Sequence, residues 1–319
     1  MTRRGTTRHG SLQFYPRCRA EKILPRVKWN AISKQGKGLM GFIGYKVGMR
    51  SAFVKDNTPN SMTKGKKIII PVTILESPPI KILSVRFYKD KKIVDEVMND
   101  ALDKELKRKI KMPKKSSKQK IEEIEKKGDF DEIRIVAYSQ AKKTGIKKTP
   151  DISEIGLAGT VAEKLEFAKN NFGKEILIKE VFKEGIVDLR GVTKGKGFQG
   201  STKRFGLSLQ QHKTEKGVRG PGSGGAWHPA RVEFAQPMAG QMGFFTRIIN
   251  NLKIVSINSI NEKDINPAGG FEHFGKIKND YVIVEGSVQG PVKRAVLITS
   301  PLRANKKHLK KNYELIELR

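Results

Sequence analysis

The chain has 319 residues, of which 64 are lysine or arginine and 32 are aspartate or glutamate, so its formal net charge is +32. An excess of that size concentrates polyanions around the protein, and nucleic acid is the expected partner. The longest apolar stretch, residues 68–75, contains Pro71 and is far shorter than the roughly 20 residues that span a bilayer. Cys18 is the only cysteine, which excludes an intramolecular disulfide and a cysteine metal cluster.

The first 38 residues form a segment that is strongly basic and poor in apolar side chains. Glu21 is its only acidic residue, and its few apolar residues show no helical or strand period. Such a segment cannot bury enough surface to offset its own chain entropy. We therefore predict that residues 1–38 form an extended basic arm, which becomes ordered on its partner. Its basic residues are Arg3, Arg4, Arg8, Arg17, Arg19, Lys22, Arg26, Lys28, Lys34 and Lys37.

Strand-like and helix-like patterns alternate after this arm. Apolar residues recur at helical spacing over 93–110, and a second short helix is predicted over 121–128. A Thr160/Glu163 capping box opens a third helical stripe, which closes at Gly173. Strands on both sides of these helices predict a mainly β fold interrupted by an α/β insert. The strand patterns cover residues 39–54, 68–75, 80–88, 133–138, 176–181, 186–192, 252–257, 281–284 and 295–299.

Gly195, Gly197 and Gly200 have the G-x-G-x-x-G spacing of a dinucleotide-binding turn after a strand. That function, typical of a nucleotide-dependent oxidoreductase, needs a following amphipathic helix and a ribose-binding acid, and neither follows convincingly. Glycine also permits left-handed turns and close backbone approach, which let backbone N–H groups and nearby cations reach phosphates. The basic neighbours favour this second interpretation, and they are Lys194, Lys196, Lys203 and Arg204.

The sequence shows no catalytic motif. A P-loop, an H-E-x-x-H motif and a nucleophile elbow are absent, and the five histidines lack metal-ligand spacing. Glu272 and His273 are adjacent, but adjacent side chains of a strand point apart, so a structural role is favoured over an acid/base pair. We therefore predict no enzyme activity, no cofactor, no metal and no small-molecule substrate.

Trp227 lies in a glycine-rich loop, residues 223–231, without apolar sequence neighbours. A tryptophan is more often part of a core than a ligand contact, and a loop can fold back onto a core. The glycines before Trp227 and Pro229 after it favour exposure instead. An exposed indole can stack on unpaired bases for about 1–3 kcal/mol, while Arg219 and Arg231 bind phosphates on either side.

Five segments resemble the family of large-subunit ribosomal protein three, in its archaeal form. They are residues 41–49 (GFIGYKVGM), 191–198 (GVTKGKGF), 225–230 (GAWHPA), 239–243 (AGQMG) and 269–275 (GGFEHFG). The resemblance implies a β-barrel of the kind shared with translation factors, an inserted α/β subdomain and two extensions that enter ribosomal RNA. It also implies that Trp227 points towards the aminoacyl-tRNA side of the peptidyl transferase centre.

With this resemblance, the chain is expected to divide into seven parts. They are an extended basic arm (1–38), the first part of the β-barrel (39–90), the α/β insert (91–175), the second part of the barrel (176–205), a central RNA-penetrating loop (206–240), the remainder of the barrel (241–300) and a basic C-terminal tail (301–319).

The predicted function is that of a structural constituent of the large ribosomal subunit in the cytoplasm, which binds 23S-type rRNA directly and supports subunit assembly. The resemblance implies proteins fourteen and twenty-four of that subunit as neighbours, and no membrane contact is expected. The alternative is a nonspecific nucleic-acid-binding protein outside the ribosome, although no groove-reading helix is evident. The residues predicted to bind RNA are the ten basic residues of the arm together with Lys194, Lys196, Lys203, Arg204, Lys213, Lys216, Arg219, Trp227, His228 and Arg231.

Overall fold

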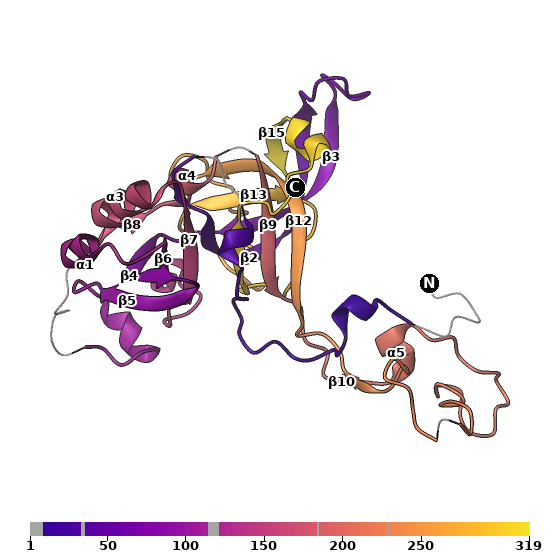
Figure 1. The fold of residues 1–319 in the computed structure, drawn as a ribbon. Coiled ribbons are helices and arrows are strands. Elements are labelled where there is room, and N and C mark those ends of the chain that lie inside the picture. Colours follow the sequence, from indigo (N-terminus) through magenta and orange to yellow (C-terminus); the bar gives the residue numbers. More distant parts are fainter. Residues whose placement is uncertain (1–8, 33–35, 114–120, 184, 229) are drawn as a thin grey trace. The chain divides into compact units, whose positions relative to one another are not determined.

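The computed structural model describes residues 9–32, 36–113, 121–183, 185–228 and 230–319. The chain forms two compact units. The smaller unit consists of Met1–Lys22 and Val192–Arg247, and the larger unit consists of Ile23–Gly191 and Ile248–Arg319. In Figure 1 the larger unit contains most of the strands, whereas the smaller unit is largely irregular.

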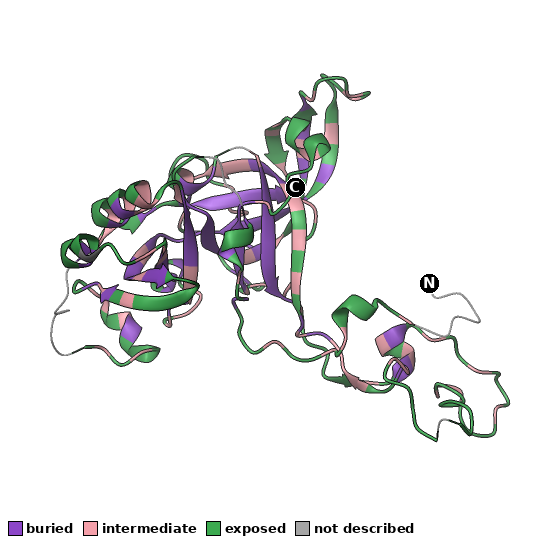
Figure 2. Ribbon diagram, in the orientation of Figure 1, coloured by how far each residue is buried: buried purple, intermediate pink, exposed green. Residues whose placement is uncertain are grey.

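The first sheet of the larger unit has seven strands in the order β14-β9-β12-β13-β3-β2-β15. Because β14 pairs with both β9 and β2, the sheet curls until its pairings form a closed ring. Every residue of β9 and β14 is buried, as expected for strands covered on both faces (Figure 2). The strands are β2 (Gly41–Asp56), β3 (Lys67–Glu76), β9 (Ile186–Val192), β12 (Thr246–Asn258), β13 (Tyr281–Glu285), β14 (Ala295–Thr299) and β15 (Tyr313–Leu318).

The second sheet of the larger unit has six strands, with the path β1-β7-β6-β4-β5 and β8 paired to β4. One continuous hydrophobic core includes buried residues of both sheets, such as Phe42 of β2 and Ile82 of β4. The strands are β1 (Gly38–Leu39), β4 (Ile80–Lys89), β5 (Lys92–Met98), β6 (Glu132–Ser139), β7 (Ile152–Ala158) and β8 (Glu175–Ile176). The helices of the larger unit are α1 (Ile121–Lys127), α2 (Ala141–Thr144), α3 (Val161–Asn171), α4 (Ile178–Val181) and α6 (Lys306–Lys310).

Most of the strand and helix predictions are confirmed. The mainly β character holds, and β3, β4, β6, β9, β12, β13 and β14 cover the predicted strand ranges. Helix α1 occupies the predicted range near residue 121. Helix α3 begins with the predicted capping box, in which the Thr160 hydroxyl accepts from the backbone of Glu163 and the Glu163 carboxylate accepts from the backbone of Thr160.

The helix predicted over residues 93–110 is wrong. Residues Lys92–Met98 form strand β5, which pairs with β4, and only Lys104–Arg108 form a short 3-10 helix. Val94, which the helical pattern placed on its apolar stripe, is 45% exposed. Pairing with an existing strand therefore outweighed the helical spacing of the apolar residues.

Three further expectations need correction. Of the strand predicted over residues 176–181, only Ile176 lies in a strand, β8, whereas Ile178–Val181 form helix α4 with Ile178 and Val181 buried three residues apart. Strand β4 was expected in the barrel part, residues 39–90, but it pairs with β5, β6 and β8 in the second sheet. The C-terminal segment 301–319 is not only a basic tail, since it contains β15, which pairs with β2.

Trp29 is a core residue that the sequence analysis missed. Its side chain is 1% exposed, and its indole Nε1 donates to the Glu154 carbonyl at 3.2 Å. A Cβ added at Gly41 would lie 2.7 Å from the Trp29 ring, and one at Gly156 would lie 2.8 Å from the Trp29 side chain, so glycine is required at both positions. Since Leu24 is also buried, the arm is not extended beyond residue 22.

A buried tyrosine connects the two sheets of the larger unit. The Tyr45 hydroxyl on β2 donates to Asp151 Oδ2 at 2.7 Å and pairs with Ser139 Oγ at 2.6 Å, and the two partners belong to the second sheet or its loops. Burial and the neighbouring Asp151 charge raise the pKa of Tyr45 well above its ordinary value, so the hydroxyl stays protonated as a donor.

We expect the substitution Tyr45→Phe to lower the free energy of unfolding by about 1–3 kcal/mol, because it removes the buried hydrogen bond from the Tyr45 hydroxyl to the charged Asp151 carboxylate, while Asp151 Oδ2 still accepts from the Lys147 ammonium. Urea unfolding of the purified protein measures this. Tyr313→Phe, at a half-buried tyrosine of β15, is the matched control and should cost less. Equal losses in the two variants would show that the Tyr45 hydroxyl is not a link between the sheets.

Candidate RNA-binding surface

Short antiparallel pairings close one end of the smaller unit, which we call its base. Strand β10 (Phe198–Gln199) pairs with β11 (Gly240–Gln241), and helix α5 (Ser201–Phe205) follows β10. Gly243 has φ +71°, and an added Cβ would lie 2.1 Å from the Lys194 carbonyl oxygen, so only glycine allows this closure. The chain between the two short strands therefore leaves and returns at one place.

Arginines stacked on aromatic rings hold this base together. The Arg17 guanidinium lies 4.1 Å from the centroid of the buried Phe205 ring, and its Nη1 donates to the Arg204 carbonyl at 2.7 Å. Arg204 in turn donates to the carbonyls of Gln241, at 2.9 Å, and Met238, at 3.0 Å. Tyr15 stacks against Phe205 with 6.2 Å between ring centroids. The sequence analysis missed Tyr15 and Phe205, although the interleaving of aromatic and basic residues was visible.

Residues 9–22 belong to this base and do not form a separate arm. The Ala20 amide donates to the Phe244 carbonyl at 2.8 Å. The Arg247 guanidinium lies 4.3 Å from the Phe14 ring centroid and 5.1 Å from that of Phe245. The N-terminal segment and the long central segment are therefore parts of one unit, in which cation–π contacts replace a conventional apolar core.

Trp227 is exposed, which excludes the core interpretation of this residue. Its side chain is 86% exposed in a loop that contains no helix or strand among its described residues, 206–228 and 230–239. Gln236 Nε2 donates to the Ser223 carbonyl at 3.4 Å, a link between the two sides of the loop. His228, Arg219 and the other described residues around Trp227 are exposed or half-buried (Figure 2).

The smaller unit carries fifteen lysine and arginine residues and three acidic residues. Among its described residues, no ion pair joins a lysine or arginine to an acidic side chain, Arg247 aside. Burial and the neighbouring Arg17 charge lower the pKa of Arg204. An anion bound beside these two guanidinium groups would relieve that repulsion.

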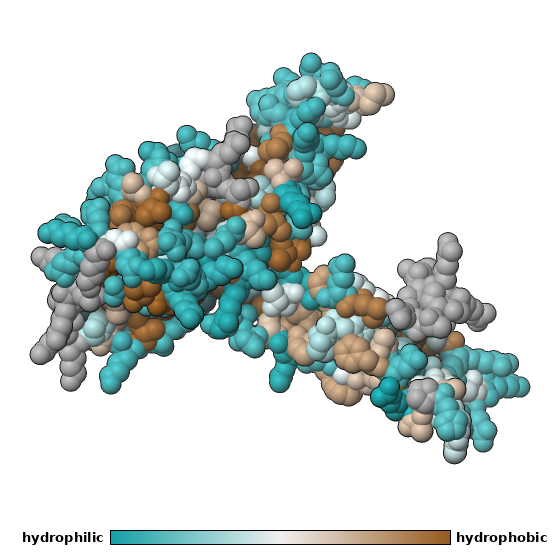
Figure 3. All heavy atoms as spheres, viewed as in Figure 1, coloured by the Kyte–Doolittle hydropathy of each residue, from teal (hydrophilic) through white to brown (hydrophobic). Residues whose placement is uncertain are grey.

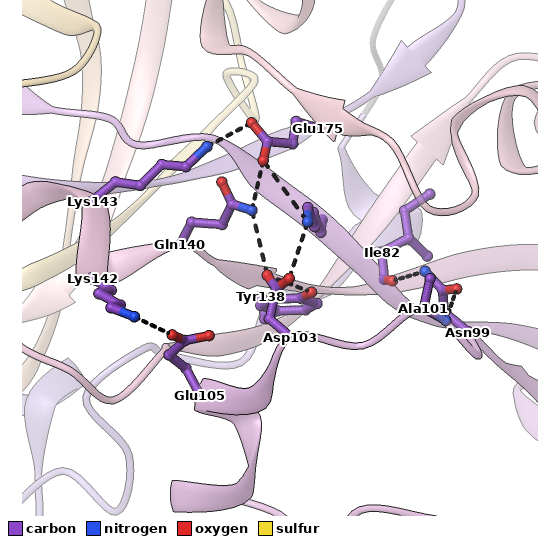
Figure 4. Close-up of polar contacts among 11 residues, drawn as sticks. Ile82, Asn99, Ala101, Asp103, Glu105, Tyr138, Gln140, Lys142, Lys143 and Glu175 are labelled. Atoms are coloured by element: carbon purple, nitrogen blue, oxygen red, sulfur yellow. Dashed lines mark hydrogen bonds and ion pairs between the residues drawn. The ribbon is translucent and has the colours of Figure 1, made fainter. Parts of the chain in front are cut away.

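In the larger unit, several lysines form ion pairs with glutamates. Figure 4 shows Lys143 paired with Glu175 and Lys142 paired with Glu105, both at 2.7 Å. Hydrophilic residues cover much of the visible face of both units in Figure 3, so hydropathy alone does not distinguish them. What distinguishes the smaller unit is that, in the part that the structure describes and Arg247 aside, none of its lysines and arginines pairs with an acidic side chain.

The residues predicted to bind RNA have several environments. Arg17 and Arg204 are half-buried and fix the base, while Arg26, Lys28 and Lys37 belong to the larger unit, where Lys37 pairs with Glu163 at 3.0 Å. Arg3, Arg4, Arg8 and Lys34 lie outside the described residues. The remaining residues that were predicted to bind RNA are exposed in the smaller unit, and they are Arg19, Lys22, Lys194, Lys196, Lys203, Lys213, Lys216, Arg219, Trp227, His228 and Arg231.

The dinucleotide interpretation of the three glycines fails on topology. The residues after Gly195 enter β10, which is antiparallel to β11, and the following helix α5 has only five residues. A dinucleotide fold needs a parallel strand and a longer helix. Glu272 and His273 lie on a tight turn, where Glu272 Oε1 and His273 Nε2 are 3.2 Å apart, so the expectation that these side chains point apart is wrong. Both are exposed, and no further titratable partner contacts them among the described residues.

Comparisons with known proteins identify the family. The family described as Ribosomal protein L3 matches residues 1–319. The large ribosomal subunit protein uL3 of Methanocaldococcus jannaschii is 42% identical over 93% of this chain and 91% of its own length. The uL3 proteins of Methanobrevibacter smithii and Archaeoglobus fulgidus are 42% and 40% identical, over 96% and 94% of this chain and 95% and 93% of their own lengths. No helix in the described residues is long and apolar enough to cross a membrane. The chain therefore belongs to the ribosomal protein L3 family, whose members are structural components of the large ribosomal subunit and not enzymes.

Proposed function

We propose that this protein binds 23S-type rRNA directly in the cytoplasmic ribosome, supports assembly of the large subunit and extends Trp227 towards the peptidyl transferase centre. The exposure of Trp227 carries this proposal, on a basic unit whose described lysines and arginines, Arg247 aside, form no ion pair with an acidic side chain. A side chain that is 86% exposed contributes little to the stability of the fold, so the indole of Trp227 is available to bind a partner. Folded RNA supplies both a stacking face and phosphates.

The mechanism combines charge neutralisation with a preformed shape. Each exposed lysine or arginine that meets a phosphate releases condensed counterions, which favours binding at low and moderate salt. The base formed by Arg17, Phe205 and Arg204 is ordered by contacts within the chain, so these residues lose little freedom on binding. Glycines such as Gly225, with φ +147°, let the backbone of the loop approach RNA closely.

The family resemblance extends the proposal to the finer architecture. The closed ring of pairings in the first sheet supports a barrel of the kind shared with translation factors, and the second sheet supports an inserted α/β subdomain. The neighbours that we propose in the subunit are proteins fourteen and twenty-four. Residues 1–22 and 192–247 would form the RNA-penetrating part, a revision of the arm at 1–38 and the loop at 206–240.

Sucrose-gradient fractionation of a cell lysate tests the proposed function. The protein is expected in the large-subunit fractions at low salt, and it should remain there after a high-salt wash, because stacking and shape add to the salt-sensitive contacts. A nonspecific nucleic-acid-binding protein would be released by high salt and would bind duplex DNA as well as a 23S rRNA transcript.

The two tryptophans should respond differently to truncation. Trp227→Ala should leave the free energy of unfolding unchanged and impair large-subunit maturation or tRNA handling, because the side chain is exposed. Trp29→Ala, the matched control, should lower the free energy of unfolding by about 3–5 kcal/mol because it empties a buried site. Urea unfolding and gradient profiles of both variants provide the measurements. Destabilisation by Trp227→Ala together with normal ribosomes would contradict the RNA role.

A further inference from the structure

A long hairpin of the larger unit ends in an ordered tip that the proposed function does not use. Strands β2 and β3 pair from Tyr45 and Glu76 out to Lys55 and Lys67, and residues 56–66 connect them. We call residues 55–67 the hairpin tip. In Figure 1 the ends of β2 and β3 project together beside β15, which pairs with the outer part of β2.

A buried carboxylate organises this tip. Asp56 Oδ1 accepts from the Thr58 amide at 2.9 Å, and Asp56 Oδ2 accepts from the hydroxyls of Ser61 at 2.7 Å and Thr63 at 2.5 Å. Burial alone would raise the pKa of Asp56, but these hydrogen bonds outweigh burial and hold the pKa well below its ordinary value. The carboxylate is thus ionised, and both of its oxygens accept hydrogen bonds from residues of the loop.

The backbone of the tip is fixed as well. The Gly65 amide donates to the Asp56 carbonyl at 2.7 Å, and the Asn57 amide donates to the Asn312 carbonyl beside β15 at 2.9 Å. Asn60 has φ +60°, a left-handed conformation that asparagine tolerates better than most residues. A surface loop held by this many internal bonds is preorganised for a contact and needs little ordering on binding.

The exposed side chains of the tip are those of four lysines together with Asn57, Pro59, Asn60 and Met62. Met62 is 95% exposed. Lys55, Lys64, Lys66 and Lys67 are exposed, and none of the four forms an ion pair with an acidic side chain among the described residues. The only carboxylate of the tip is that of Asp56, which is buried. The tip therefore presents four free ammonium groups around a flexible thioether.

We infer that the hairpin tip is a second RNA contact, in which the four lysines bind phosphates and Met62 packs against a base or ribose in a groove or bulge. This inference rests on the proposed function, because it assigns a further site to the same RNA partner. Lysine neutralises phosphate with release of counterions, and exposed apolar side chains such as methionine insert at irregular base steps.

A protein partner fits this surface less well. Protein interfaces are depleted in lysine and need an apolar centre, with about 800 Å² buried on each side. The tip offers a single large apolar side chain surrounded by lysines. A neighbouring protein at this position is therefore the alternative outcome of the test.

Cross-linking locates the contact directly. The full-length protein is bound to a transcript of the 23S-type rRNA of Methanocaldococcus jannaschii, irradiated with ultraviolet light, and digested with nuclease and trypsin for mass spectrometry. Cleavage after Lys55 and Lys64 releases the peptide 56–64, which contains Met62. Nucleotide adducts are expected on this peptide or on residues 65–67. Adducts on the smaller unit but none on the tip would overturn the inference and leave the proposed function standing, whereas no binding at all would contradict both.

A charge-matched pair of variants provides the second readout. The variant K64A/K66A/K67A should reduce the magnitude of the slope of log affinity against log salt by about 2 to 3, one phosphate contact for each lysine. The control K92A/K126A/K174A removes the same charge from exposed lysines of the second sheet and its helices, and should leave the slope almost unchanged. Equal slopes for the two variants would show that only net charge matters, and would overturn the site. Circular dichroism of both variants should match that of the parent protein, because all six side chains are exposed.

Discussion

The constraint on which the smaller unit depends is that its many cations must lie close together with few acidic residues among them. Fifteen lysine and arginine residues share that unit with three acidic residues. The unit does not neutralise its guanidinium groups but satisfies them through aromatic rings and backbone carbonyls, as Arg17 does with Phe205 and the Arg204 carbonyl. Such contacts satisfy the donors and leave the positive charge in place. The charge therefore remains available to phosphates, and the same residues order the unit.

The larger unit differs because some of its lysines form ion pairs with carboxylates, as Lys143 does with Glu175. Its sheets are joined by contacts such as those of the Tyr45 hydroxyl. The hydrophobic core of this unit is continuous across both sheets, which favours a fold that is stable without RNA. At the hairpin tip, Asp56 turns its carboxylate inward, and none of the four lysines forms an ion pair with an acidic side chain among the described residues. Unpaired lysines on ordered backbone are thus common to both proposed RNA contacts.

The strands were predictable because their β-branched runs bury both faces, and β9 and β14 kept their predicted ranges. Strand β5 was not, since Val94 matches a helical period but lies in a strand held by pairing with β4 across a two-residue turn at Asp90 and Lys91. Local spacing contains no information about a partner strand. The same limit hid β15, which forms only because the outer part of β2 is available for pairing.

The amino-acid sequence by itself determined the large positive charge that favours a polyanion partner, most of the strands and helices, the glycines that allow close turns and the motifs of the family. Charge, the spacing of apolar residues and residue type are properties of the chain that do not depend on how it folds. Only the tertiary structure decided which tryptophan is buried and which cations are free. Trp29 lies in the basic N-terminal segment and Trp227 in the glycine-rich loop, yet one is 1% exposed and the other 86%. The difference arises from distant segments, because Gly41 and Gly156 leave room for the Trp29 ring and nothing described covers the ring of Trp227.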